Sequence, residues 1–454
     1  MHAMDKTKAT DMTQGSPLRL ILLFTIPLLL GNLLQQLYNI GDSKVVSYYL
    51  DEHALAAVGM TAVVSNMLIG LINGFTQGFG IMTANAFGAG DADRIRRYIA
   101  GAVGLTAFLV VLLSVLAFTF IGNILELLQT PDEIMDNALA YVRVILIGIL
   151  FSAIYNLSAN ILRSLGDSKT PLYCLTASIV LNILLDLLFV GVVGWGIRGA
   201  AVATVISQAI AGLVCLIYGV LRFREYMPRR KDFHVRKGEM SDLFFTGLSM
   251  GLMGCIVNIG TILLQGSINI LGADTVTAHT AGRRLVDILM ALIYTYGFTM
   301  TTYVSQNTGA GRSDRIKLGV RIAVIIVTVE SLVLIGFTFL FSKGIVTWIA
   351  STDSDFIISQ ATMYTRVMIC FFPALGPLFI LRCTLQGVGH KIIPLLSSVL
   401  ELTVKVVSVL WLTPKLGYLG VALTEPISWV LMTLILSIGY MRWCRSTGTG
   451  RRGR

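Results

Sequence analysis

The chain has 454 residues, of which 55% are hydrophobic and 13% are charged, and its formal net charge is +10. An ordinary soluble domain carries about 25% charged residues, and the mean hydropathy of this chain is +0.77. The composition therefore excludes a soluble globular protein and predicts an integral membrane protein.

Apolar segments recur along the whole chain, and about 20 such residues suffice to cross a bilayer as a helix. We therefore expect an all-α polytopic membrane protein with twelve transmembrane helices. The first residues contain no short apolar core with a cleavage site, so they are predicted to be a tail and not a signal peptide. The predicted spans are 18–46, 54–85, 95–121, 137–162, 170–193, 198–221, 241–270, 276–306, 317–342, 359–381, 392–413 and 418–441.

The sequence repeats itself at a spacing of 221 to 223 residues. Residues 88–96, GAGDADRIR, return as residues 309–317, GAGRSDRIK, and both copies lie between long apolar segments. Gly166 and Gly389, each followed by a proline five residues later, keep a spacing of 223. One half of the chain is therefore a diverged copy of the other.

Six predicted spans in each half are an even number, so both halves enter the membrane from the same side. Such parallel repeats are related by an axis along the membrane normal, and the working site of a transporter often lies between them. We expect a cytoplasmic N-terminal tail (1–17), an N-lobe (18–221), a linker (222–239), a C-lobe (240–441) and a basic cytoplasmic tail (442–454). The basic linker either simply joins the lobes or also contacts anionic lipid headgroups.

Basic residues concentrate on one side of the predicted membrane. With the N-terminus in the cytoplasm, 24 lysines and arginines fall in inner tails and loops, Arg382 and Lys391 among them, and three fall in outer loops, Arg198, Lys343 and Lys415. This pattern predicts that both termini are cytoplasmic. The net charge therefore reports orientation in a plasma membrane, expected to be a bacterial inner membrane, and not a nucleic-acid partner.

Motifs of several enzyme classes are missing from the sequence. It contains no GxxxxGK[ST] phosphate-binding loop and no HExxH or Cys/His metal cluster, and no Ser-His-Asp arrangement stands out. We therefore predict that the protein is not an enzyme and holds no cofactor. Uphill movement of a substrate would then use an ion gradient.

Carboxylates inside the spans of the first half indicate where an ion would bind. Asp186 lies in the middle of the fifth span and Asp42 lies in the first. A charge at mid-bilayer costs about 2.5–3.5 kcal/mol on insertion scales, so such residues are usually functional or paired. Asn182 shares a helix face with Asp186, and Thr204 lies in the sixth span. These oxygen donors suit Na+, and the carboxyl groups also suit a proton relay.

Both carboxylates also have a purely structural interpretation. Asp186 would then only accept hydrogen bonds from neighbouring helices, and Asp42 would lie near the surface if the first span ended earlier. We favour the functional interpretation because polar residues surround each carboxylate at helical spacing. Tyr38 and Asn39 lie one turn before Asp42.

The second half does not repeat this arrangement. At a spacing of 223, Asn182 falls on Lys405 and Asp186 falls on Val409. Lys405 instead follows Glu401 by one helical turn. The two charges either neutralise each other to reduce the cost of insertion, or form a second proton or substrate site.

Further acidic residues lie in the spans of the second half. Asp287 follows two arginines, Arg283 and Arg284, and indicates a charge cluster at an inner helix end or cavity wall. Glu330 and Glu425 are further candidates that the sequence alone does not assign to the protein interior or to the lipid face.

These features resemble the multidrug and toxic compound extrusion (MATE) family of the multidrug/oligosaccharidyl-lipid/polysaccharide flippase superfamily. The resemblance covers residues 16–445 and implies two bundles of six helices. The segments that carry it are the first span SPLRLILLFTIPLLLGNLLQQLYNIGD, the two Gly-Ala-Gly loops, ILRSLGDSKTP, LNILLD and GIRGAAVAT.

The resemblance also implies site residues. Some members of the family have an acidic residue in the seventh span. In this chain the segment LMGCIVNIGTILLQGSINI of that span (252–270) has none, so the implied cation site is that of the N-lobe. The cation-binding residues carried over are Asp42, Asn182, Asp186 and Thr204. The resemblance also implies that Tyr38 and Asn156 line the cavity. From the spacing and charge described above, Asn39, Asp287, Glu401 and Lys405 are further expected cavity-lining positions.

The leading hypothesis is an antiporter that exports small amphipathic or cationic drug-like substrates in exchange for Na+ or H+. We expect a monomer in contact with membrane lipids. The alternative is a flippase for lipid-linked oligosaccharides or lipids, which needs a cavity rich in basic residues. Arg143, Arg366 and Lys405 are the candidates for it. A sensor or channel is a third hypothesis, which no additional soluble domain supports.

Overall fold

The computed structural model describes residues 10–50, 52–127 and 130–449, and these ranges contain helices and no β-strand. The two halves are joined by two short 3-10 helices, η2 (Arg224–Tyr226) and η3 (Arg230–Phe233). The other helices in chain order are α1 (Pro17–Tyr49), α2 (Glu52–Gly88), α3 (Ala92–Leu127), α4 (Asp132–Ser164), α5 (Lys169–Asp186), η1 (Leu187–Val192), α6 (Gly196–Arg222), α7 (Lys237–Asn269), α8 (Ala273–Gly309), α9 (Ser313–Ala350), α10 (Asp355–Cys370), α11 (Phe372–Gly387), α12 (Ile392–Val407), η4 (Ser408–Leu412), α13 (Thr413–Leu416) and α14 (Tyr418–Thr449).

The number of membrane spans agrees with the prediction. In the described part of the chain, eleven helices are long and apolar enough to cross a membrane. Helices α10 and α11 meet the same requirement as a pair that is bent by 51° at its break, which gives twelve if the pair counts as one span. Pro373 stands in the first turn of α11. Its ring clashes with the carbonyl four residues earlier, which ends the preceding helix, whereas its missing N–H costs nothing in a first turn. The tenth predicted span is therefore one broken helix.

The repeat is visible in the backbone. Glycines in the left-handed region, where a Cβ atom would be strained, occupy equivalent turns in both halves. Helices α5 and α12 also both pass into a short π-helix, η1 and η4. The equivalent glycines are Gly90 and Gly311 (φ +70° and +67°), Gly166 and Gly389 (+89° and +92°), and Gly196 and Gly417 (+59° and +58°).

The chain divides into two compact units whose boundaries lie inside α1 and α7. Unit 1 holds Leu30–Gly254 and the segment that ends at Asp11, and unit 2 holds Met12–Leu29 and Cys255–Arg454. The first part of α1 therefore belongs to the unit of the later helices, and the first part of α7 belongs to the unit of the earlier ones. The two repeats exchange the beginnings of their first helices.

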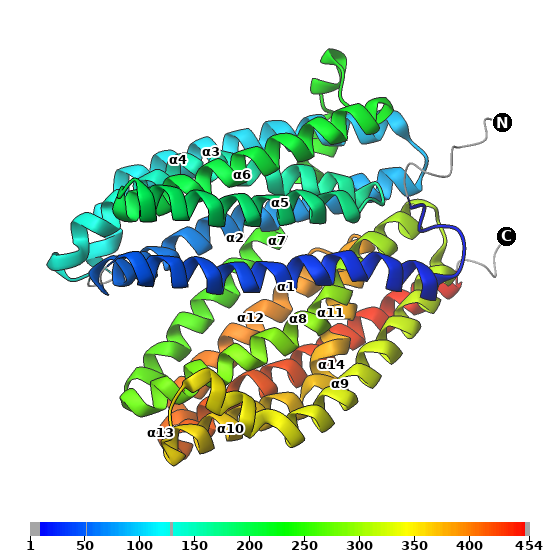
Figure 1. Cartoon of the computed structure of the whole chain (residues 1–454). Coiled ribbons are helices and arrows are strands. Elements are labelled where there is room, and N and C mark those ends of the chain that lie inside the picture. The colour runs from blue at the N-terminus through cyan, green and yellow to red at the C-terminus, as the bar shows by residue number, and fades with distance from the viewer. Residues whose placement is uncertain (1–9, 51, 128–129, 450–454) are drawn as a thin grey trace. The chain divides into compact units, whose positions relative to one another are not determined.

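Within unit 1, α4 packs against α2, α3 and α6, and α5 packs against α6 (Figure 1). The first part of α7 meets α2 through two GxxxG sequences. A Cβ atom added to Gly78 of α2 would lie 2.6 Å from the Cα of Gly247, and one added to Gly74 would lie 2.6 Å from the Cα of Gly251. Small residues at such positions let two helix backbones approach closely.

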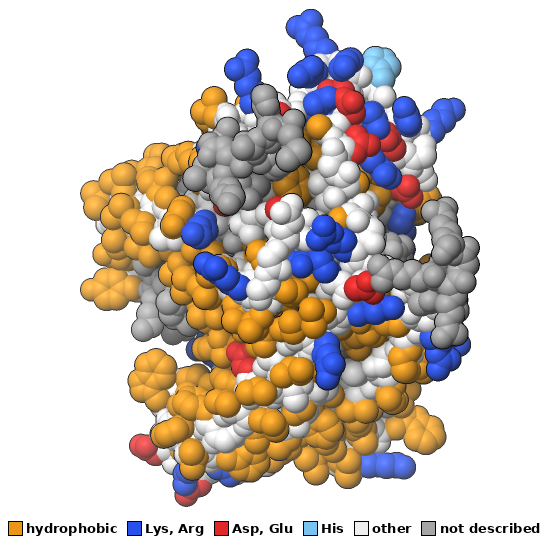
Figure 2. Space-filling model, turned by 90° about the vertical axis from the view of Figure 1, so that its right-hand side faces the viewer, with side chains coloured by type: hydrophobic (Ala, Val, Ile, Leu, Met, Phe, Trp, Pro, Cys, Tyr) orange, Lys and Arg blue, Asp and Glu red, His pale blue; other side chains and the backbone are white. Residues whose placement is uncertain are grey.

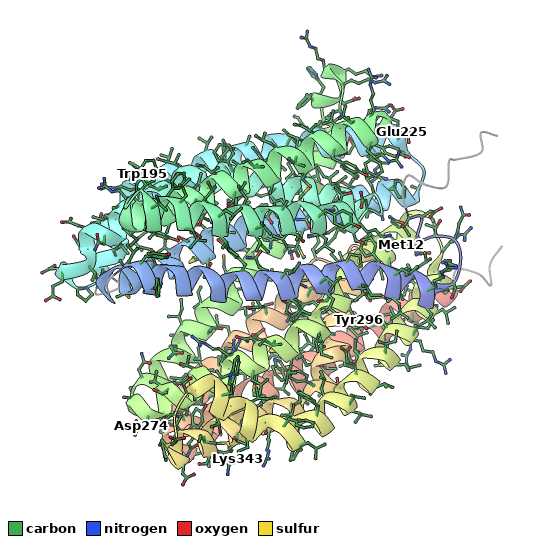
Figure 3. The ribbon with its side chains drawn as sticks, in the orientation of Figure 1. Met12, Trp195, Glu225, Asp274, Tyr296 and Lys343 are labelled. Atoms are coloured by element: carbon green, nitrogen blue, oxygen red, sulfur yellow. The ribbon has the colours of Figure 1, made fainter. Side chains whose placement is uncertain are left out.

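Within unit 2, α8 packs against α9, α10 and α11, and α14 packs against α11 and α12. The first part of α1 joins this unit through Thr25, whose hydroxyl lies 2.8 Å from that of Thr299 in α8. The segment before α1 is held as well. The backbone N–H of Met12 (Figure 3) donates to Gln306 Oε1 at 2.9 Å, and Arg315 donates to the carbonyl of Gly15 at 2.9 Å.

In each unit, an arginine that follows the Gly-Ala-Gly loop binds the segment that leads into α1 or α7. Arg315 follows the second loop and holds the segment before α1, whereas Arg96 follows the first loop and holds the linker before α7. Arg96 donates to the carbonyl of Glu225 (Figure 3) at 2.9 Å, and Arg97 pairs with Glu239 of α7 at 2.8 Å. Figure 2 shows lysine and arginine side chains on the surface, interspersed with hydrophobic and acidic ones.

Candidate functional site

The last turn of α5 presents two polar side chains to the interior of unit 1. Asn182 and Asp186 lie one helical turn apart, and their exposed fractions are 1% and 0%. Directly after Asp186 the chain winds into the π-helix η1. Single π-helical turns within helices are frequent at functional sites. The backbone conformation and the buried polar side chains therefore both indicate a candidate site at Asp186.

Asn182 connects Asp186 to α6. Because a carboxylate only accepts hydrogen bonds, the amide is oriented with its nitrogen towards Asp186, and it then donates to Asp186 Oδ2 at 2.9 Å. In this orientation the amide oxygen accepts from the backbone N–H of Thr204 at 3.2 Å. The hydroxyl oxygen of Thr204 lies 3.5 Å from the same amide. The structure thus brings together three of the predicted cation-binding residues.

The other predicted residues of the first half are placed differently. The side chains of Asp42 and Asn39 lie outside the described residues, although their backbone belongs to α1. Tyr38 is partly buried in the same helix. Asn156, in α4, donates to the carbonyl of Ser152 in its own helix at 2.9 Å, so its amide nitrogen is used locally.

A second polar group lies in unit 2 and joins α8 to α14. Arg283 donates to Asp287 at 2.7 Å within α8 and to Glu425 of α14 at 2.8 Å. The Asp287 side chain is 42% exposed and Glu425 is 9% exposed. The cluster that the sequence predicts around Asp287 therefore also includes the buried Glu425, which the sequence alone did not assign to the interior or to the lipid face.

The pair of Glu401 and Lys405 on α12 extends this group further. Lys405 Nζ lies 3.0 Å from Glu401 Oε1 and 3.9 Å from Glu425 Oε1, and the lysine side chain is 1% exposed. Arg382 of α11 lies 3.8 Å from Glu401. The three acids and three bases are formally neutral together. We call them the charge cluster, and its members are Asp287, Arg283, Glu425, Lys405, Glu401 and Arg382.

The prediction that Arg382 lies in a cytoplasmic loop is wrong. Helix α11 runs to Gly387, six residues beyond the predicted end of that span at 381, and Arg382 is 8% exposed. An arginine is tolerated there because Glu401, from the next helix, approaches its guanidinium. Only a contact between helices compensates this charge, so hydropathy along one segment could not reveal it.

The described side chains contain no group of three or more histidine, cysteine, aspartate or glutamate residues that could hold a metal ion. Asn182 and Thr204 fall outside that class of ligand, and both belong to the group around Asp186.

The sequence model of the MatE family matches residues 27–188 and 250–411, one match in each half. The chain belongs to the MatE family. These two matches have the same spacing of 223 residues as the predicted repeat. Membership in this family of MATE transporters confirms the resemblance found in the sequence, and it confirms that the protein is a multi-pass membrane transporter and not an enzyme.

Similar bacterial proteins cover two thirds of the chain or more. The probable multidrug resistance protein YoeA of Bacillus subtilis is 29% identical over 93% of this chain and 92% of its own length. The probable multidrug resistance protein YpnP of the same organism is 31% identical over 68% of this chain and 69% of its own. A crystal structure of a MATE protein in a bent conformation has a TM-score of 0.89 at 22% identity, covering 97% of this chain and 99% of that one, which confirms the fold.

Proposed function

We propose that the protein is a secondary antiporter that exports amphipathic or cationic drug-like compounds in exchange for Na+ or H+. The observation that carries the proposal is Asp186, a fully buried carboxylate in a membrane span. It is held by an amide that can either donate a hydrogen bond or offer an oxygen atom. The names of the similar bacterial proteins support the substrate class.

The group around Asp186 can serve either ion. For Na+, rotation of the Asn182 amide by about half a turn would exchange its N–H for an oxygen, so that carboxylate and amide oxygens face the ion together with Thr204. For H+, the carboxyl group of Asp186 takes the proton, and after the same rotation the amide oxygen can accept a hydrogen bond from the protonated carboxyl group. In both cases the ion neutralises the buried charge, which removes much of the cost of keeping it away from water.

We propose that neutralisation of the Asp186 charge is coupled to transport. Entry of the ion supplies free energy, since one elementary charge crossing 100 mV is worth about 2.3 kcal/mol. Ion binding would change the relative stability of outward-facing and inward-facing arrangements of the two lobes. We place the protein in the bacterial inner membrane with both termini in the cytoplasm, because basic residues concentrate in the predicted inner loops.

The test is Asp186→Asn, which removes the charge and keeps the shape. Cells that express the variant should lose drug export while the amount of protein in the membrane stays unchanged. The matched control is Asp136→Asn, which changes an exposed aspartate of α4 and should export as the wild type does. Full export by Asp186→Asn would rule out this coupling site.

The flippase alternative gains little from the structure. Its three basic candidates are each engaged locally: Arg143 is exposed beside the ring of Phe118, Arg366 donates to the carbonyl of Phe339, and Lys405 pairs with Glu401. A pyrophosphate group would have to compete with these partners. We therefore favour the antiporter.

A further inference from the structure

The charge cluster stands at the position that the Asp186 group has in the first repeat. At the spacing of 223 residues that relates α5 to α12, Asn182 is equivalent to Lys405. At the spacing of 221 that relates α6 to α14, Thr204 is equivalent to Glu425. Both pairs are in proximity: the Asn182 amide lies 3.5 Å from Thr204 Oγ1, and Lys405 Nζ lies 3.9 Å from Glu425 Oε1.

The first helix of each repeat continues this equivalence. At the spacing of 223, Tyr38 of α1 corresponds to Thr261 of α7, and Thr261 Oγ1 lies 3.5 Å from Lys405 Nζ. The neighbouring Gly260 makes room for the lysine, because a Cβ atom added there would lie 2.7 Å from Lys405 Cδ. The lysine side chain therefore extends from α12 to α7 through the space that Gly260 leaves free.

The two repeats differ in the placement of charge. The two aspartates proposed for the first repeat, Asp42 and Asp186, correspond to Gln265 and Val409 in the second. The carboxylates have not disappeared from the second repeat, because Glu401 and Glu425 supply them one helical turn away or on the facing helix. What the second repeat adds is a cation that is covalently part of the chain.

The surroundings of this cation are those of an ion site. Lys405 Nζ faces Glu401 Oε1, Glu425 Oε1 and Thr261 Oγ1, which are the hard oxygen donors that a small cation prefers. Glu425 Oε2 is buried and has no hydrogen-bond partner among the described residues. One oxygen of this carboxylate is therefore still open to a hydrogen-bond donor or a cation.

We propose that Lys405 is a tethered cation that permanently fills the second repeat's equivalent of the ion site. It follows that the C-terminal repeat binds no exchangeable cation, and that only the first repeat takes part in ion exchange. The cage of Glu401, Glu425 and Thr261 would accept a free monovalent cation, an alkali ion or a small primary ammonium ion, once the lysine is removed. This inference extends the proposed function to the second repeat.

The experiment measures equilibrium binding of radioactive Na+ to the purified full-length protein, with methylammonium as competitor. All variants carry Asp186→Asn, so that the proposed first-repeat site cannot supply the signal. Asp186→Asn alone should bind no cation in the C-lobe. Adding Lys405→Ala should create one saturable site that methylammonium competes for, and adding Lys405→Arg, which keeps the tethered charge, should not.

The gained site must depend on the carboxylates. Adding Glu425→Gln to the Lys405→Ala protein should abolish the gained binding. Lys405→Gln serves as a second variant if Lys405→Ala does not fold. Uptake of one proton in place of a cation, or a gained site that survives Glu425→Gln, would overturn the proposal. So would a cation site that is already present with Lys405 intact and is lost with Glu425→Gln.

These outcomes are separable from failure of the proposed function. If transport proves independent of Asp186, the coupling site of the first repeat is wrong, but the gain of binding on removal of Lys405 still reports on the second repeat. If coupling through Asp186 holds and Lys405→Ala gains no site, the tethered-cation proposal alone fails.

Discussion

The orientation of the Asn182 amide determines what the Asp186 carboxylate can bind. A hydrogen bond to a charged group contributes about 1.5–3 kcal/mol, and here it fixes the carboxylate of Asp186 against α5 and α6. Thr204 supplies the backbone N–H that orients the amide from its other side. Affinity for the coupling ion should therefore depend on Asn182 as well as on the acid.

We predict that Asn182→Leu, which keeps the size of the side chain, shifts the ion dependence of transport by about tenfold or more, since 1.4 kcal/mol corresponds to a factor of ten. For Na+ coupling, the loss of an oxygen ligand should raise the half-saturating Na+ concentration. For H+ coupling, the loss of a donor to the carboxylate should move half-maximal activity to higher pH.

Thr204→Val keeps the backbone N–H and removes only the hydroxyl, so its effect should be smaller. Titration of transport with Na+ at fixed pH, and with pH in the absence of Na+, checks both variants. An Asn182→Leu protein with wild-type dependence on both ions would contradict the geometry.

Single residues also show what the sequence could and could not predict about the site. The turn that joins Asn182 to Asp186 and the turn that joins Glu401 to Lys405 follow from helical spacing, and both were predicted. The contacts of Glu401 with Arg382 and of Glu425 with Arg283 join different helices, so no local pattern contains them. The charge cluster therefore became visible only when the helices were packed.

At the scale of elements, glycines allow α2 and α7 to approach each other closely. Helices α2 and α7 meet where a Cβ atom added to Gly74 or Gly78 would contact the backbone of Gly251 or Gly247. The two GxxxG patterns stand in the sequence, but a pattern of this kind does not name its partner helix. This contact matters because it binds the first part of α7 to unit 1.

We predict that Gly78→Ala destabilises the protein by about 1–3 kcal/mol, the usual cost of overpacking, because the added methyl group meets the backbone of Gly247 and not a flexible side chain. The measurement is thermal unfolding in detergent. Gly104→Ala is the matched control, since a Cβ atom there has nothing within 4 Å. Alanine should be neutral or slightly stabilising at that position of α3. Equal unfolding temperatures for the two variants would refute the close packing.

At the scale of the whole molecule, the main feature is that the two repeats exchange the first parts of α1 and α7. The spans could be predicted because each depends on residues close in sequence, and the repeat could be predicted by comparing the two halves of the chain. The exchange of the first parts of α1 and α7 could not, because it depends on which unit those residues contact. The two Gly-Ala-Gly loops and the arginines after them now have a structural explanation, since they hold the segments that enter the exchanged helices.

The orientation in the membrane belongs to this scale as well. We predict that Asp353→Cys, at an exposed position between α9 and α10, reacts with a membrane-impermeant thiol reagent in intact cells. Lys231→Cys, exposed in the linker, should react only after the cells are opened. The unmodified chain is the control for its own cysteines. The reverse labelling pattern would invert the proposed topology.

The most direct test of the account is drug transport by the purified protein in liposomes, with a Na+ gradient and a pH gradient imposed separately. We predict that the wild-type protein transports drug under one of these gradients and that Asp186→Asn transports under neither, while Asp136→Asn behaves as the wild type. Transport that needs neither gradient, or that Asp186→Asn leaves intact, would contradict the coupling of export to the buried carboxylate.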